Sequence, residues 1–106
     1  MYDLKHIAKE LGFAPDDVKM IVSVLFEDAE KSMQEIEKMY EKKAWKQIAY
    51  EVHSIKGSAA NMKLTELSQL ALQLEQSAQD EDAQKVSVLI NALKENLLLL
   101  QQALHF

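Results

Sequence analysis

The 106-residue sequence contains no cysteine and no arginine, and it has only two glycines and one proline. The lack of cysteine excludes disulfides, thiolate catalysis and sulfur-ligated metal sites. The scarcity of glycine and proline argues against a β-rich fold, whose tight turns depend on them. The lack of arginine and the net charge of −5 argue against nucleic-acid binding.

Long apolar runs are also missing. No run approaches the roughly 18 residues that span a bilayer, and the chain opens without a basic-then-apolar leader. We therefore expect a cytoplasmic protein without membrane segments. The length fits one domain that covers residues 1–106.

Apolar residues recur at steps of three and four, which is typical of amphipathic helices. Asp3 and Gly12 suit the two ends of a short first helix, Pro15 suits the start of the second, and Thr65 suits the cap of the fourth. The third predicted helix runs from about residue 44 to residue 62, the fourth follows the cap at Thr65, and the fifth follows a polar turn at residues 79–84 and carries apolar residues from Val86 to Leu104. This pattern predicts an all-α fold, an antiparallel four-helix bundle with a short additional N-terminal helix.

Two features leave alternatives open. Between Met39 and Trp45 there is neither glycine nor proline, so one continuous helix of roughly 45 residues, about 70 Å long, would also fit the periodicity. Such a rod could not bury its apolar stripe in a small domain, and we place a turn near residues 41–44. The seven-residue seam from Val86 to Leu104 would also fit a dimeric, purely structural bundle.

The region from Lys42 to Lys63 is basic, although the whole chain is acidic. It contains one acidic residue and has a local charge of +4, so the rest of the chain carries −9. Its five lysines are Lys42, Lys43, Lys46, Lys56 and Lys63.

His53 lies in the middle of this region. On a helical wheel, its side chain points about 130° away from the apolar face of the third predicted helix. The neighbouring positions on the same surface column are small residues, namely Ala49, Gly57 and Ala60, with Lys46 at the far end of the column. Lys56 flanks the column on the side of the core, so its charge lies near His53.

Glycine inside a helix costs about 1 kcal/mol relative to alanine, so Gly57 needs a reason. Either it clears the approach to His53, or it allows close helix packing. An exposed imidazole with a nearby cation and a clear approach is suited to accept a phosphoryl group. The simpler alternative is an ordinary surface histidine.

The stretch "HSIKGSAANM" (residues 53–62) resembles the signature of histidine-containing phosphotransfer (HPt) domains, His-x-x-Lys-Gly followed by small residues. The flanking "AWKQIAYEV" and "LTELSQLALQLEQSAQ" are similar to that family too, and so is the plan of five helices. One departure is Lys63, where many family members have glycine. The departure puts the geometry of that turn in question.

The resemblance implies a phosphocarrier without an ATP site, in a multistep two-component phosphorelay. His53 would accept a phosphoryl group on Nε2 from the aspartyl phosphate of a receiver domain and pass it to another receiver. Lys56 would stabilise the phosphoryl group and Gly57 would keep the approach open. Glu75, with Gln76 as the alternative, would bind the other ring nitrogen and orient the ring.

The resemblance also implies the partners: receiver domains of response regulators and, as a further candidate, a hybrid sensor kinase. Lys46, Ala49, Ala60 and Lys63 would contact them in a transient complex with a monomeric carrier. The chain would bind no cofactor itself, and Mg²⁺ would come from the receiver. His6 and His105 lack ligand-like spacing to His53, so we expect no metal site. A rival hypothesis is an adaptor module that binds receivers or helices without being phosphorylated.

Overall fold

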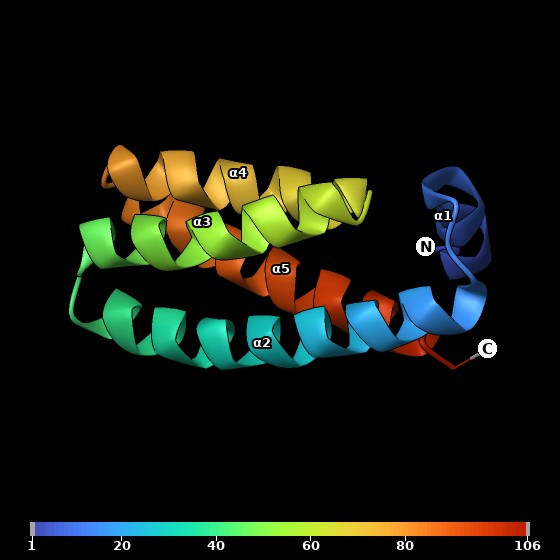
Figure 1. Ribbon diagram of the computed structural model, residues 1–106. Coiled ribbons are helices and arrows are strands. Elements are labelled where there is room, and N and C mark those ends of the chain that lie inside the picture. Colours follow the sequence, from blue (N-terminus) through green and yellow to red (C-terminus); the bar gives the residue numbers. More distant parts are fainter. Residues whose placement is uncertain (1, 106) are drawn as a thin grey trace.

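The computed structural model describes residues 2–105, which form five α-helices and no strand (Figure 1). The helices are α1 (Leu4–Leu11), α2 (Pro15–Glu41), α3 (Trp45–Asn61), α4 (Thr65–Gln79) and α5 (Ala83–Ala103). The molecule measures 42 × 19 × 19 Å along its principal axes. The predicted all-α bundle with a short first helix is confirmed.

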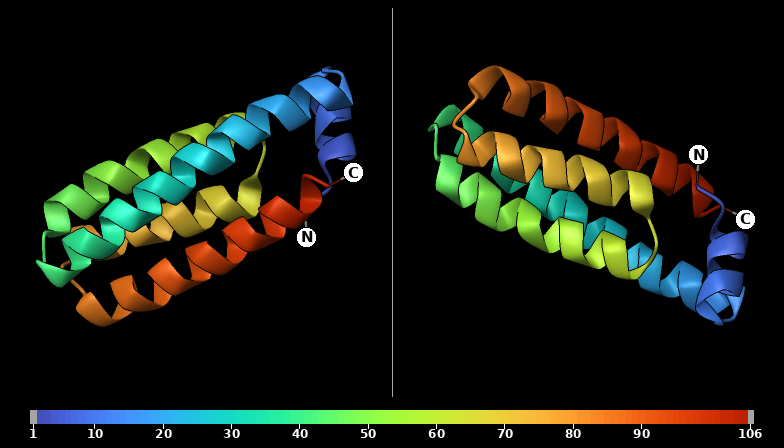
Figure 2. Two further views of the ribbon diagram at one scale, coloured as in Figure 1. Left: turned by 90° about the horizontal axis from the view of Figure 1, so that it is seen from below. Right: turned by 90° about the horizontal axis from the view of Figure 1, so that it is seen from above.

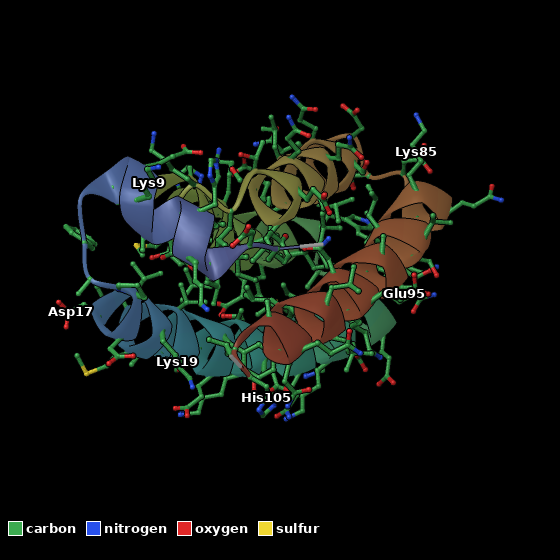
Figure 3. All side chains as sticks on the ribbon, turned by 90° about the vertical axis from the view of Figure 1, so that its right-hand side faces the viewer. Lys9, Asp17, Lys19, Lys85, Glu95 and His105 are labelled. Atoms are coloured by element: carbon green, nitrogen blue, oxygen red, sulfur yellow. The ribbon has the colours of Figure 1, made fainter. Side chains whose placement is uncertain are left out.

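Helices α2 to α5 run antiparallel to their neighbours in the sequence, with short connections at alternating ends (Figure 2). Helix α1 crosses one end of the bundle, close to the connection between α3 and α4 (Figures 1 and 3). The connections α2–α3 and α4–α5 lie together at the opposite end (Figure 1). Each long helix therefore presents one stripe to the centre and another to solvent.

The core contains buried side chains from all five helices. The seam of α5 belongs to it, because Val86, Ile90, Leu93, Leu97, Leu100 and Leu104 are all buried against the same chain. These residues are therefore occupied within the chain, which removes the basis for a dimer held together by that seam. The helical spacing of the apolar residues in α2 predicts Ile21 in the core, and this prediction is wrong. Ile21 is 41% exposed, while Phe26 on the same helix is buried.

The three connections between the long helices share one geometry. Each has three residues, and the middle residue, Lys43, Lys63 or Glu81, has a left-handed φ of 55–57°. The amide after it donates a hydrogen bond to the carbonyl five residues back, at 2.9–3.0 Å, which closes the preceding helix as a Schellman motif. Glycine is the usual residue at such a position, so these turns form without the residue that normally predicts them.

This geometry accounts for the departure at residue 63. The backbone adopts the left-handed conformation that glycine tolerates best, and Lys63 adopts it in spite of its Cβ. The turn geometry itself is therefore retained. The predicted cap of α4 is wrong, because Thr65 is the first helical residue and the cap position belongs to Leu64, without a side-chain hydrogen bond.

Candidate functional site

His53 lies on the solvent face of α3, in its central part. The residues that α3 buries are Ile48, Val52, Ile55 and Ala59, so the opposite stripe of the helix carries His53. Its side chain is 66% exposed. A partner can therefore reach the imidazole from solvent without any rearrangement of the bundle.

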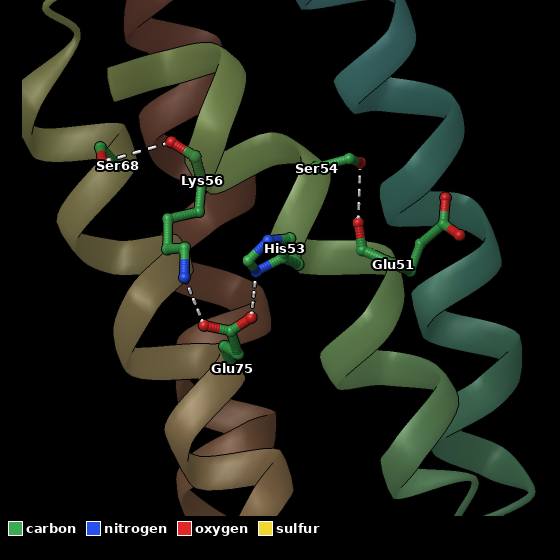
Figure 4. A network of polar contacts seen from close by, with 6 residues as sticks. All are labelled: Glu51, His53, Ser54, Lys56, Ser68 and Glu75. Carbon is green, nitrogen blue, oxygen red and sulfur yellow. Dashed lines mark hydrogen bonds and ion pairs between the residues drawn. The ribbon is translucent and has the colours of Figure 1, made fainter. Parts of the chain in front are cut away.

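One edge of the imidazole is held by α4. The Nδ1 atom of His53 lies 2.6 Å from Oε2 of Glu75, a residue that is 8% exposed (Figure 4). The connection of three residues between α3 and α4 brings these two side chains together, although they are 22 positions apart in the sequence.

The second carboxylate oxygen of Glu75 binds Lys56. The ammonium of Lys56 donates a hydrogen bond to Oε1 at 2.7 Å, and this lysine side chain is only 26% exposed (Figure 4). The backbone carbonyl of Lys56 also accepts a hydrogen bond from Ser68 Oγ on α4, at 3.4 Å. Lys56 and His53 are thus linked through one carboxylate, which their spacing in the sequence alone did not indicate.

The ammonium of Lys56, which donates a hydrogen bond to Glu75, lowers the pKa of that carboxyl below its usual 4.5, and the hydrogen bond from His53 acts in the same direction. Burial opposes both effects without cancelling them. Glu75 is therefore ionised at neutral pH, and both of its oxygens act only as acceptors.

An ionised carboxylate beside Nδ1 fixes the hydrogen of the neutral imidazole on that nitrogen. The lone pair then lies on Nε2, at the opposite edge of the ring from Glu75. Because most of the His53 side chain is exposed, Nε2 is the nitrogen that can attack an incoming electrophile.

Gly57 lies one turn after His53 on the same stripe. A Cβ added to Gly57 would have no atom of the chain within 4 Å, outside the backbone of its own helix. Close helix packing within this chain therefore does not explain the glycine, and access to His53 stays a prediction. Ala60 is exposed a further turn along, and Ala49 is half-buried one turn before His53.

The predicted docking residues lie at both ends of this stripe. Lys46 is exposed near the start of α3, and Lys63 lies beyond its end, with Nζ 3.7 Å from Oε2 of Glu10 on α1. Tyr50, three positions before His53, is 84% exposed and is not among the predicted docking residues. On the wheel it lies next to His53 and away from the core.

In the described part of the chain, neither His6 nor His105 bonds to His53, Lys56 or Glu75, although His6 lies close to Lys63. His6 pairs with Glu10 inside α1, and His105 is exposed beyond the end of α5 (Figure 3). Within residues 2–105, no cluster of three or more His, Asp or Glu side chains could hold a metal ion. None of the helices in this part of the chain has the length and apolar character needed to cross a membrane.

A helical bundle with an exposed histidine, anchored by a carboxylate from the next helix, defines a class of site suited to histidine chemistry. The Hpt domain family model matches residues 20–103, most of the chain. The chain therefore belongs to the Hpt domain family, which implies histidine phosphotransfer in a phosphorelay and receiver domains as partners. Searches of curated proteins and of solved structures gave no significant match. The match begins after α1, so that helix lies outside the family model.

Proposed function

We propose that this protein is a phosphocarrier whose His53 accepts a phosphoryl group from the aspartyl phosphate of one receiver domain and passes it to another. The single observation that carries the proposal is the 2.6 Å contact between His53 Nδ1 and the ionised Glu75, with Nε2 at the exposed edge. The proposal includes a monomeric carrier in the cytoplasm, without an ATP site of its own.

In the proposed reaction, the lone pair on Nε2 attacks the phosphorus of the aspartyl phosphate. The new N–P bond forms as the P–O bond to the receiver's aspartate breaks, and that aspartate leaves as a carboxylate. The ring keeps the hydrogen on Nδ1 and becomes positively charged, so no proton has to leave. Glu75 is placed to balance this charge, and transfer to a second receiver is the same step in reverse.

Lys56 would have two roles in this reaction. Its ammonium holds Oε1 of Glu75, which keeps the carboxylate oriented toward Nδ1. Part of its side chain remains exposed on the side of His53, where a cation would attract the phosphoryl oxygens. The Mg²⁺ would be held by carboxylates of the receiver.

The rival adaptor hypothesis requires only a binding surface. It gives no reason for a buried carboxylate that receives hydrogen bonds from both Lys56 and His53, because burying a charged group is costly unless it is fully paired. An adaptor could present the same small residues without that arrangement. The geometry therefore favours the carrier.

The test uses a panel of receiver domains that have been phosphorylated beforehand and are mixed with the native protein. Intact-mass spectrometry should detect a phosphoryl adduct that is labile in acid and stable in base. Fragmentation should map it to His53, with His6 and His105 as internal controls for unspecific phosphorylation. An adduct on either of those residues, or no adduct from any receiver, would contradict the proposal.

A series at Gly57 tests the reason for the glycine. Alanine should raise the free energy of unfolding by up to about 1 kcal/mol, because the site is open and alanine favours a helix. Leucine should leave the fold intact. It should slow phosphoryl transfer about tenfold, because forcing extra atoms into the contact with the receiver costs about 1–2 kcal/mol. The measurements are denaturant unfolding and transfer kinetics. Equal transfer rates for glycine and leucine would disprove the access argument, and Ser58→Leu on the neighbouring stripe is the control.

A further inference from the structure

The five lysines of the basic region fall into two groups in the structure. Lys56 is paired with Glu75, and Lys63 with Glu10. Within residues 2–105, Lys42, Lys43 and Lys46 form no ion pair, and all three are exposed. The uncompensated positive charge is therefore concentrated at one end of α3 rather than spread around His53.

Lys43 and Lys46 border a groove at the end of the bundle opposite α1, where the α2–α3 and α4–α5 connections meet (Figure 1). The groove has a volume of about 610 Å³. Its residues include Lys43, Lys46, the half-buried Trp45, Ala49 and Ala78, with Glu81 as its one acidic member. The walls are thus partly apolar and partly cationic.

The groove is continuous with the stripe that carries His53. Ala49 belongs to both, since it borders the groove and lies one turn before His53. Lys46 lies seven residues before His53, which is about 10 Å along the helix axis. A partner that reaches His53 and extends along α3 in this direction therefore enters the groove.

The position of Lys46 is unfavourable for α3 itself. It lies in the first turn, near the positive end of the helix dipole, where acidic residues are the stabilising ones, and this turn contains none. The preceding cap residue, Ala44, provides no side-chain hydrogen bond. An unpaired cation that opposes the stability of its own helix indicates a role outside the fold.

We infer that this groove is a specificity site that binds acidic side chains of the partner receiver, about 10 Å from its aspartyl phosphate. The inference rests on the proposed function. It adds that the carrier prefers receivers whose acidic side chains face the groove. Lys43 and Lys46 act on the encounter with the receiver and take no part in the bond-making step at Nε2. Charge complementarity of this kind speeds association without requiring a tight complex.

The experiment measures transfer from the fastest donor of the receiver panel to native protein and to Lys46→Glu. The variant should raise KM about tenfold and leave the maximal rate unchanged, because the site around His53 is intact. In 1 M salt, where the screening length is about 3 Å, the difference should nearly vanish. Lys43→Glu/Lys46→Glu should show a larger effect, and Lys46→Gln an intermediate one.

Lys31→Glu provides the matched control, because Lys31 is an exposed lysine on α2 outside the groove. A thermal melt checks the fold, and Lys46→Glu should raise Tm because it places an acid in the first turn of α3. If the KM for transfer to Lys46→Glu equals that for native protein or for Lys31→Glu, the proposal of a specificity site is wrong. The proposal of a phosphocarrier is then unaffected. If no receiver phosphorylates native protein, both fail.

Discussion

Replacing His53 by glutamine is expected to reduce phosphoryl transfer by a factor of about 10³ or more, to the background of the assay. The amide nitrogen of glutamine has no available lone pair, so the variant lacks the nucleophile. Its amide can still donate a hydrogen bond to Glu75, and the substituted side chain lies mostly in solvent, so the fold should be unchanged. Phosphorylation is measured by intact mass, and stability by denaturant unfolding.

The same variant separates the carrier from the adaptor. If the protein is a carrier, His53→Gln should still bind receivers in a titration followed by NMR, with amide shifts on α3, while phosphorylation is lost. His105→Gln is the control, because that histidine is exposed and lies beyond the end of α5. Undiminished phosphorylation of His53→Gln would show that another residue accepts the phosphoryl group.

Replacing Glu75 by leucine is expected to slow transfer by about 10²-fold, the lower end of what a positioned acid–base group contributes. The substitution removes the acceptor that fixes Nδ1–H and the negative charge that balances the phosphorylated ring. It also leaves the ammonium of Lys56 without its partner. Glu75→Gln should slow phosphoryl transfer about tenfold, since an amide oxygen accepts the hydrogen bond without providing the negative charge.

A spectroscopic readout distinguishes positioning from a general structural defect. In native protein the ¹⁵N spectrum of His53 should show the tautomer with hydrogen on Nδ1, and Glu75→Leu should lose that preference. Gln76→Leu on the adjacent, exposed position is the matched control and should leave both the tautomer and the transfer rate unchanged. A native transfer rate in Glu75→Leu would contradict the proposed role of the carboxylate.

The lowered pKa of Glu75 adds a prediction for stability in acid. Because the pKa is lower in the folded state, the ionised carboxylate stabilises the fold above the ordinary value of 4.5. This contribution should be lost as the pH falls below 4.5 and through the lowered pKa of the folded state. Glu75→Gln should show a smaller loss of stability over that range, measured by denaturant unfolding.

The sequence predicted the helices well, because each carries apolar residues at helical spacing and the long ones bury them as expected. It predicted the turns less well, since Lys43, Lys63 and Glu81 adopt left-handed backbone conformations that their side chains do not favour. There, hydrogen bonds that close the helix and packing of the neighbouring helices outweigh the local preference. Ile21 is a different case, because its place on the wheel lies at the margin of the buried stripe.

For the site, the wheel placed His53 and Gly57 on the solvent face of one helix, and both lie there. The partnership with Glu75 came only from the family resemblance, because the relative rotation of α3 and α4 decides which residues meet. The bond from Lys56 to the same carboxylate, and the separation of the lysines into paired and unpaired groups, depend on tertiary structure. No spacing within a single helix could reveal them.

The three-residue connection between α3 and α4 has a consequence for the order of folding. It places His53 and Glu75 in one helical hairpin, 22 positions apart, and contacts between consecutive helices form early because little loop entropy is lost. The α3–α4 hairpin would then assemble the reactive geometry before α1 closes the end of the bundle. A nascent or partly unfolded chain could in this way already present a competent histidine.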